Sequence, residues 1–162
     1  MRRTVALALL ALVAAACVGE PDPNLTESGK GKPQVTALMP NEAEPGSTVT
    51  AAVRIANPGP GDMESVVVAF SRIGNAGLPA PIVDVGTGGR TDGVKSVRPE
   101  PVAVSQDAVV YRFGGLPEGE ALEIRFELVL PENEEGEVGN AILVYDGAEP
   151  DRAKGTRLST FL

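Results

Sequence analysis

The sequence predicts an all-β protein, an antiparallel sandwich of about seven to eight strands. Residues Ala121–Leu130 alternate apolar and mostly charged side chains, which is the period of a strand with one buried face. The 19 glycines and 14 prolines make up about a fifth of the 162 residues, which is typical of a turn-rich chain. No stretch beyond the N-terminal leader has a helical period. A barrel is the alternative architecture.

Residues 1–16 are typical of a secretory signal. Arg2 and Arg3 supply a positive start, and the apolar run that follows is shorter than the ~20 residues of a membrane-spanning helix. The sequence Ala14–Cys17 resembles the lipobox of bacterial lipoproteins, with alanine where leucine is usual. The resemblance implies cleavage before Cys17, acylation of this cysteine, and anchoring to the outer face of a bacterial membrane in the cell envelope. Ordinary signal cleavage without lipid is the alternative.

Residues 17–33 are expected to form the lipidated cysteine and a flexible tether. Val18–Pro33 is rich in proline, glycine and charge and has almost no large apolar side chain, so it cannot offset its ordering entropy by burial. A coil of this length reaches on the order of 20–25 Å. That reach is enough to hold a domain clear of lipid headgroups.

Residues 34–162 are expected to form one domain, in which short apolar or alternating runs indicate the strands. Val35–Met39 is apolar and is ended by a proline. Ser47–Ala56 alternates with period two. Glu64–Ile73 carries two valines and a phenylalanine on one face, and Ile82–Val85 is a short apolar run between breakers.

The glycine-rich stretch Gly86–Gly93 is expected to be a mobile loop. Ala108–Phe113 and Ala121–Leu130 follow as strands, and an acidic turn separates them from Asn140–Tyr145 and Thr156–Phe161. Tyr111 and Tyr145 are each a candidate for a tyrosine corner, in which the hydroxyl bonds to the backbone. The inward faces predict a core of Val53, Ile55, Val68, Phe70, Ile124, Phe126 and either Ile142 or Leu143.

Three turn motifs resemble the immunoglobulin-like domains of bacterial surface proteins, namely the conserved repeat of unknown function in cell-wall proteins and the adhesion-related domain. These motifs are Pro45–Thr50, the Asn57-x-Gly59 turn after the second strand, and Leu116–Glu120. Gly86–Arg98 does not fit the family and is expected to be an insertion. The resemblance implies an immunoglobulin-like sandwich that serves as an extracellular structural or adhesive module, with no catalytic residues.

The charge and the missing residue types exclude several functions. The net charge is −8, and it becomes −10 once the two leader arginines are removed. Phosphate backbones and anionic headgroups would be repelled, so we expect no nucleic-acid partner and a domain that stands off the membrane. The chain has no histidine and one cysteine, which excludes histidine-dependent triads, histidine-ligated metals and an internal disulfide. We assign no catalytic, cofactor-binding or metal-ligating residues.

The predicted function is therefore that of a membrane-anchored lipoprotein presenting an interaction or structural module to a protein partner in the envelope. The alternative is an accessory protein that binds a sugar or calcium through Gly86–Gly93 and the acidic loop Glu132–Gly139, with Asp146, Glu149 and Asp151 nearby in sequence. A hydrolase is the weakest option, since the chain has few aromatic side chains to form a sugar platform.

Overall fold

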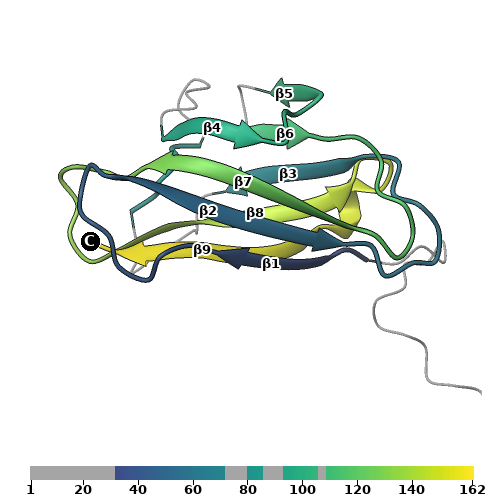
Figure 1. Cartoon of the computed structure of the whole chain (residues 1–162), viewed down its shortest axis with the longest axis horizontal. Coiled ribbons are helices and arrows are strands. Elements are labelled where there is room, and N and C mark those ends of the chain that lie inside the picture. The colour runs from purple at the N-terminus through teal and green to yellow at the C-terminus, as the bar shows by residue number, and fades with distance from the viewer. Residues whose placement is uncertain (1–31, 72–79, 86–92, 106–108) are drawn as a thin grey trace, which may run out of the picture.

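Two antiparallel sheets packed face to face form the domain in the computed structural model, which describes residues 32–71, 80–85, 93–105 and 109–162 (Figure 1). One sheet has the order β1-β2-β7-β4 and the other β5-β6-β3-β8-β9. The strands are β1 (Gln34–Leu38), β2 (Thr48–Ala56), β3 (Val66–Ser71), β4 (Val94–Arg98), β5 (Ala103–Ser105), β6 (Val110–Arg112), β7 (Ala121–Val129), β8 (Glu137–Asp146) and β9 (Lys154–Phe161). A short 3-10 turn, η1 (Pro150–Arg152), precedes β9.

This arrangement confirms the predicted immunoglobulin-like sandwich over a barrel. The order β1-β2-β7-β4 corresponds to strands A, B, E and D of the immunoglobulin fold, and β9-β8-β3 corresponds to G, F and C. Strands β6 and β5 extend the second sheet beyond β3, as C′ and C″ do in variable domains. The chain makes β4 before β5 and β6, whereas the corresponding D strand comes after C′ and C″ in a variable domain.

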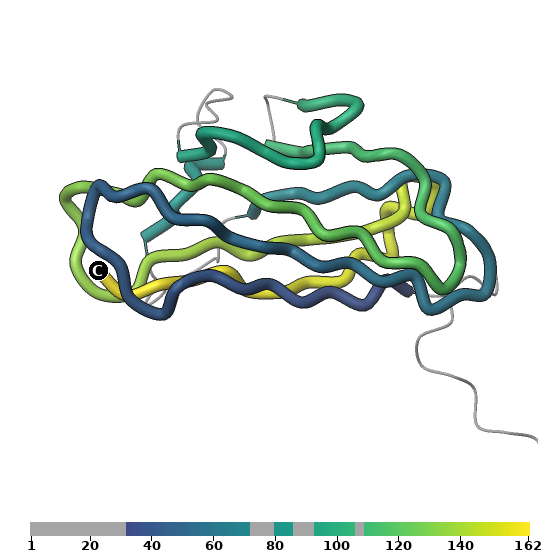
Figure 2. Tube along the Cα trace, in the orientation of Figure 1, coloured from purple at the N-terminus to yellow at the C-terminus, as the bar shows by residue number. Residues whose placement is uncertain are grey.

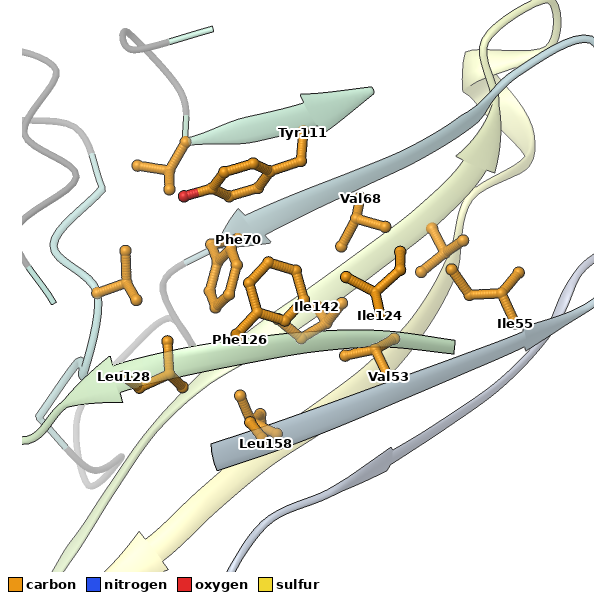
Figure 3. Close-up of a cluster of buried hydrophobic side chains, with 14 of the residues drawn as sticks. Val53, Ile55, Val68, Phe70, Tyr111, Ile124, Phe126, Leu128, Ile142 and Leu158 are labelled. Carbon is orange, nitrogen blue, oxygen red and sulfur yellow. The ribbon is translucent and has the colours of Figure 1, made fainter. Parts of the chain in front are cut away.

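The core lies between the sheets and contains the predicted residues, with Ile142 rather than the half-buried Leu143. Period-two alternation places Val53 directly opposite Ile124 in the β2–β7 register, so that both point inward. Phe70, Tyr111 and Phe126 pack edge to face, with ring centroids 5.2 to 6.1 Å apart (Figure 3). These three rings join β3, β6 and β7 across the sandwich.

The predicted strand Ile82–Val85 is wrong. The segment is irregular because the amides of Ile82 and Val83 donate to the side-chain oxygen of Asn140 rather than to a neighbouring strand, at 3.1 and 2.9 Å. Ile82 and Val83 are nevertheless buried and belong to the core, which the predicted core did not include. One isolated bridge, from Ala80 to Val138, links the start of the segment to β8.

The expected insertion Gly86–Arg98 is wrong in its last part, because Val94–Arg98 is strand β4 and pairs with β7. A register shift between Val94 and Ser96 lets Val94 oppose Leu128 and Val97 oppose Phe126. Both valines therefore face inward although they are three positions apart, and this spacing hides the strand from a search for strict alternation. The three-residue strand β5 was also missed.

Candidate functional site

The strands run along the length of the domain, so its loops gather at two ends (Figure 2). β1 begins at one end, beside η1, and a cleft of about 550 Å3 lies there between the chain before β1 and the start of β9. Its lining is Lys32, Pro33, Gln34, Val35, Asp151, Arg152, Ala153 and Lys154. Any segment that precedes residue 32 joins the domain at this end. We call it the tether end.

Asn57 ties two loops together at the tether end. Its side-chain amide donates to the carbonyls of Gly61 and Leu116, each at 2.9 Å, and its oxygen accepts from the amide of Gly59 at 3.1 Å. Gly59 has a φ of +79°, which a residue with a side chain rarely adopts. The backbone of Gly119 also donates to the Asn57 carbonyl. Two of the three turn motifs that carried the family resemblance therefore pack against each other and have a structural role.

Asp146 holds a second turn at the same end. Its carboxylate is buried and accepts hydrogen bonds from the amides of Glu64, Ser65 and Ala148 at 3.1 to 3.3 Å. These contacts involve both oxygens of the carboxylate. Asp146 thus fixes the chain between β2 and β3 against the end of β8.

The acidic loop before β8 lies at the opposite end of the domain. Strand β8 has Glu137 as its first residue and Asp146 as its tenth, so about 30 Å separate them at the rise of an extended strand. The structure therefore does not bring the two acidic groups of the predicted calcium site together. Within the described ranges, no group of three or more Asp, Glu or Cys side chains converges as metal ligands would.

The two long sides of the sandwich differ. On one side β1 and β9 lie next to each other and cover each other's edges (Figure 1). There the amide of Ala43 donates to the Phe161 carbonyl and the amide of Phe161 donates to the Asn41 carbonyl, both at 2.9 Å. On the other side β4 and β5 are the outermost strands of their sheets.

A groove of about 410 Å3 runs between β4 and β5. Its lining mixes polar and apolar groups and comprises Val94, Lys95, Ser96, Val97, Glu100, Pro101, Val104 and Tyr111. Burial raises the pKa of Tyr111 to about 12, so its phenol is neutral at physiological pH and cannot act there as a base. In the described part of the chain, neither this hydroxyl nor that of Tyr145 donates to a backbone carbonyl as a tyrosine corner requires. This groove and the edge of β5 form the candidate binding surface.

Several predicted features lie outside the described residues: the signal peptide, Cys17, the tether up to residue 31, and Gly86–Gly93 except its last glycine. Across the residues that are described, no helix is long and apolar enough to cross a membrane. Sequence reasoning missed Asn140 and the β4–β5 groove. The available signal for Asn140 was its place at the start of the apolar run NAILVY, because an amide side chain that is buried there needs several hydrogen-bond partners.

Comparisons with known proteins give only distant similarities. No protein-family model matches the chain, and no curated protein matches it significantly. Among solved structures, the seventh PapD-like domain of human CEP192 is 14% identical, with 88% of this chain and 92% of that chain covered and a TM-score of 0.39. The human F-spondin reeler domain is 12% identical, with 80% of this chain and 92% of that chain covered and a TM-score of 0.48.

A conjugative transposon lipoprotein from Bacteroides eggerthii is 11% identical, with 79% of this chain and 93% of that chain covered and a TM-score of 0.39. Similarities this weak say nothing about activity or partners. The function of the chain is therefore argued from its own residues.

Proposed function

We propose that this protein is a lipoprotein anchored to a bacterial membrane in the cell envelope, where it presents an immunoglobulin-like interaction or structural module. The observation that carries the proposal is the position of the sole cysteine, Cys17, directly after a signal-like apolar run and before a segment rich in proline, glycine and charge. Acyl chains on this cysteine would hold the protein durably, at ~0.8 kcal/mol for each buried methylene.

The geometry of the domain supports this proposal. The chain reaches β1 at the tether end, so an anchor at Cys17 would leave the opposite end and both long sides free for a partner (Figure 1). The acidic net charge keeps the module soluble and away from anionic headgroups. The role of the module is then to bind or support another envelope protein.

Mass spectrometry of the protein from its native host tests the anchor. The expected result is an N-terminal peptide that begins at Cys17 and carries a diacylglyceryl group, and a Cys17→Ser variant that leaves the membrane fraction. An unacylated peptide beginning at Cys17 would overturn the lipid anchor and leave a secreted module. An uncleaved N-terminus would overturn the extracytoplasmic placement as well.

A thermal melt with calcium and with EDTA separates this proposal from the accessory ligand-binding alternative. Calcium that binds only the folded state raises the melting temperature. We expect no shift. A rise of several degrees with calcium would favour the alternative.

A further inference from the structure

The outer faces of the two sheets carry different side chains. On β7, in the four-stranded sheet, the outward residues from Glu123 onward are mostly charged and all exposed, namely Glu123, Arg125, Glu127 and Val129. On β8, in the five-stranded sheet, the central outward residues are apolar and half-buried, namely Ala141, Leu143 and Tyr145. A sheet face in contact with water normally carries polar side chains, as β7 does. The outer face of β8 departs from that rule.

Strand β3 continues this apolar outer face. Val67 is only 1% exposed, yet it lies outside the cluster of core side chains between the sheets, to which its neighbour Val68 belongs. Val67 and Ala69 face outward, opposite Tyr145 and Leu143 in the β3–β8 register. Strands that are apolar on both faces are typical of sheets covered on both sides.

The outer face of the five-stranded sheet carries little charge. Within its described strands, the outward charged residues are Arg112, Arg157 and Glu137. Arg157 and Glu137 form a salt bridge, and the Arg112 guanidinium donates to the Ser65 hydroxyl at 3.0 Å. The net charge of −8 therefore comes from other parts of the chain. Because charges more than ~8 Å apart are largely screened at physiological ionic strength, it does not prevent two such faces from meeting.

The size and shape of the face suit another sheet. At ~3.3 Å per residue and ~4.8 Å between strands, the five strands cover on the order of 500 Å2 in plan. Side-chain relief makes the accessible area larger, which brings it close to the ~600 Å2 per partner at which specific interfaces begin. Two sheets with the same twist can stack ~10 Å apart with their strands aligned. Two copies of this face thus match each other, and each copy would bury the same residues.

The position of the tether favours a second copy over an unrelated protein. The chain before residue 32 joins the domain at the tether end, and the strands run from that end along the length of the domain (Figure 2). Copies anchored through Cys17 would therefore stand at the same height on one membrane, with their sheet faces directed sideways. Rotation about the long axis turns two such faces toward each other and keeps both tether ends on the membrane side. Confinement to one surface also raises the local concentration of copies, so a weak contact is enough.

We infer that the outer face of the five-stranded sheet binds a second copy of this chain, face to face. Val67, Ala69, Ala141, Leu143 and Tyr145 form the apolar centre of the contact, and the Arg157–Glu137 salt bridge lies at its margin on β8 and β9. The choice of a second copy rests on the proposed lipid anchor, whereas the apolar character of the face does not. The inference names a partner for the proposed interaction module.

Sedimentation equilibrium of the protein purified from its native host measures the dimer. An acylated protein is studied in density-matched detergent, and a protein that mass spectrometry finds unacylated is studied in buffer. We expect a concentration-dependent equilibrium between monomer and dimer. Ala69→Glu and Ala141→Glu should each raise the dissociation constant at least tenfold, because each places a charge in the apolar centre. Ala52→Glu is the matched control and should change it less than twofold, since Ala52 is also half-buried but lies on the outer face of β2 in the other sheet.

Cysteine crosslinking in membranes of the native host identifies the occupant without a charged substitution. Ala69→Cys and Ala141→Cys keep a small side chain on the face, so they test the contact even if a glutamate variant melts below the parent protein. Treatment with a short bismaleimide should link each variant to a second copy. Ala52→Cys and the unsubstituted chain should give no such dimer.

Several results would overturn the inference. They are a protein that stays monomeric at every concentration, a dimer that neither glutamate on the face weakens, and a dimer that Ala52→Glu weakens as strongly. Crosslinks from Ala69→Cys and Ala141→Cys to a different protein would assign the face to that protein instead. Because sedimentation is measured on the acylated or the unacylated form, a missing dimer and a missing lipid anchor are told apart by the mass-spectrometric test.

Discussion

Replacement of Asn140 by alanine is expected to be among the most damaging single changes to the domain. Asn140 is fully buried on β8. Its oxygen accepts from the amides of Ile82 and Val83, and its nitrogen donates to the carbonyls of Val83 at 2.9 Å and Ser71 at 3.3 Å. Apart from the single bridge between Ala80 and Val138, the segment from residue 80 to 85 pairs with no strand, so this side chain takes the place of a β-ladder for Ile82 and Val83.

The magnitude follows from the groups left behind. Asn140→Ala leaves three buried backbone groups without their partner, namely the amides of Ile82 and Val83 and the carbonyl of Val83, at ~1–3 kcal/mol each. The Ser71 carbonyl, which is only partly buried, is left out of this sum. If the segment relaxes enough to recover about half of the penalty, the expected loss is about 1.5–4.5 kcal/mol. Against a total stability of ~5–15 kcal/mol for a domain, such a loss is a large fraction.

Urea unfolding followed by circular dichroism measures the loss, with Asn133→Ala as the matched control. Asn133 is exposed in the acidic loop, and its replacement should change the free energy of unfolding by less than about 0.5 kcal/mol. Hydrogen exchange should also show that Ile82 and Val83 lose amide protection in Asn140→Ala. A loss below about 1 kcal/mol, with protection at both amides retained, would refute the role given to Asn140.

Three further changes test other parts of the structure. Thr160→Val should raise the free energy of unfolding by about 1 kcal/mol in thermal melts, because the Thr160 hydroxyl is buried without a partner among the described residues and a methyl group fills the same space. Asp146→Ala should cost about 2–4 kcal/mol in urea unfolding, since it removes the acceptor for three backbone amides, and an unchanged midpoint would contradict that role. Tyr111 has a folded-state pKa raised to about 12, so the folded state holds a proton that the unfolded state releases near pH 10. Stability should therefore fall as pH rises from about 10 to about 12, and Tyr111→Phe should remove this part of the fall.

The parts of the fold that the sequence predicted are those in which one strand face is buried and the other is solvated. Strand β7 shows this pattern most clearly, because Ile124, Phe126 and Leu128 are buried while the residues between them are exposed. The period of two is then visible without knowledge of the partner strands. The same holds for β2, where the predicted core residues Val53 and Ile55 are buried and Arg54 between them is exposed.

The missed elements depend on contacts that no local pattern encodes. Strand β4 packs the partly buried Val94 and Val97 against the core only because a register shift absorbs one residue, and that shift is defined against β7. Strand β5 has three residues, all exposed, and only their pairing with β6 identifies them as a strand. The segment Ile82–Val85 has strand composition, but its hydrogen bonds go to Asn140, 57 residues away in the chain from Val83. Neither the groove nor the β5 edge was therefore open to prediction.

The family resemblance and the candidate binding surface lie in different parts of the molecule. Residues of the resembling motifs are used structurally: Asn57 bonds Gly61 and Leu116, and Gly46 donates its amide to the Pro131 carbonyl at the far end. Such turns specify how the sheets are connected, and a fold alone does not define a function. The edge of β5 has no counterpart in those motifs, since Val102 and Val104 fall between them in sequence. The turns that carry the resemblance therefore account for the fold and not for a binding partner.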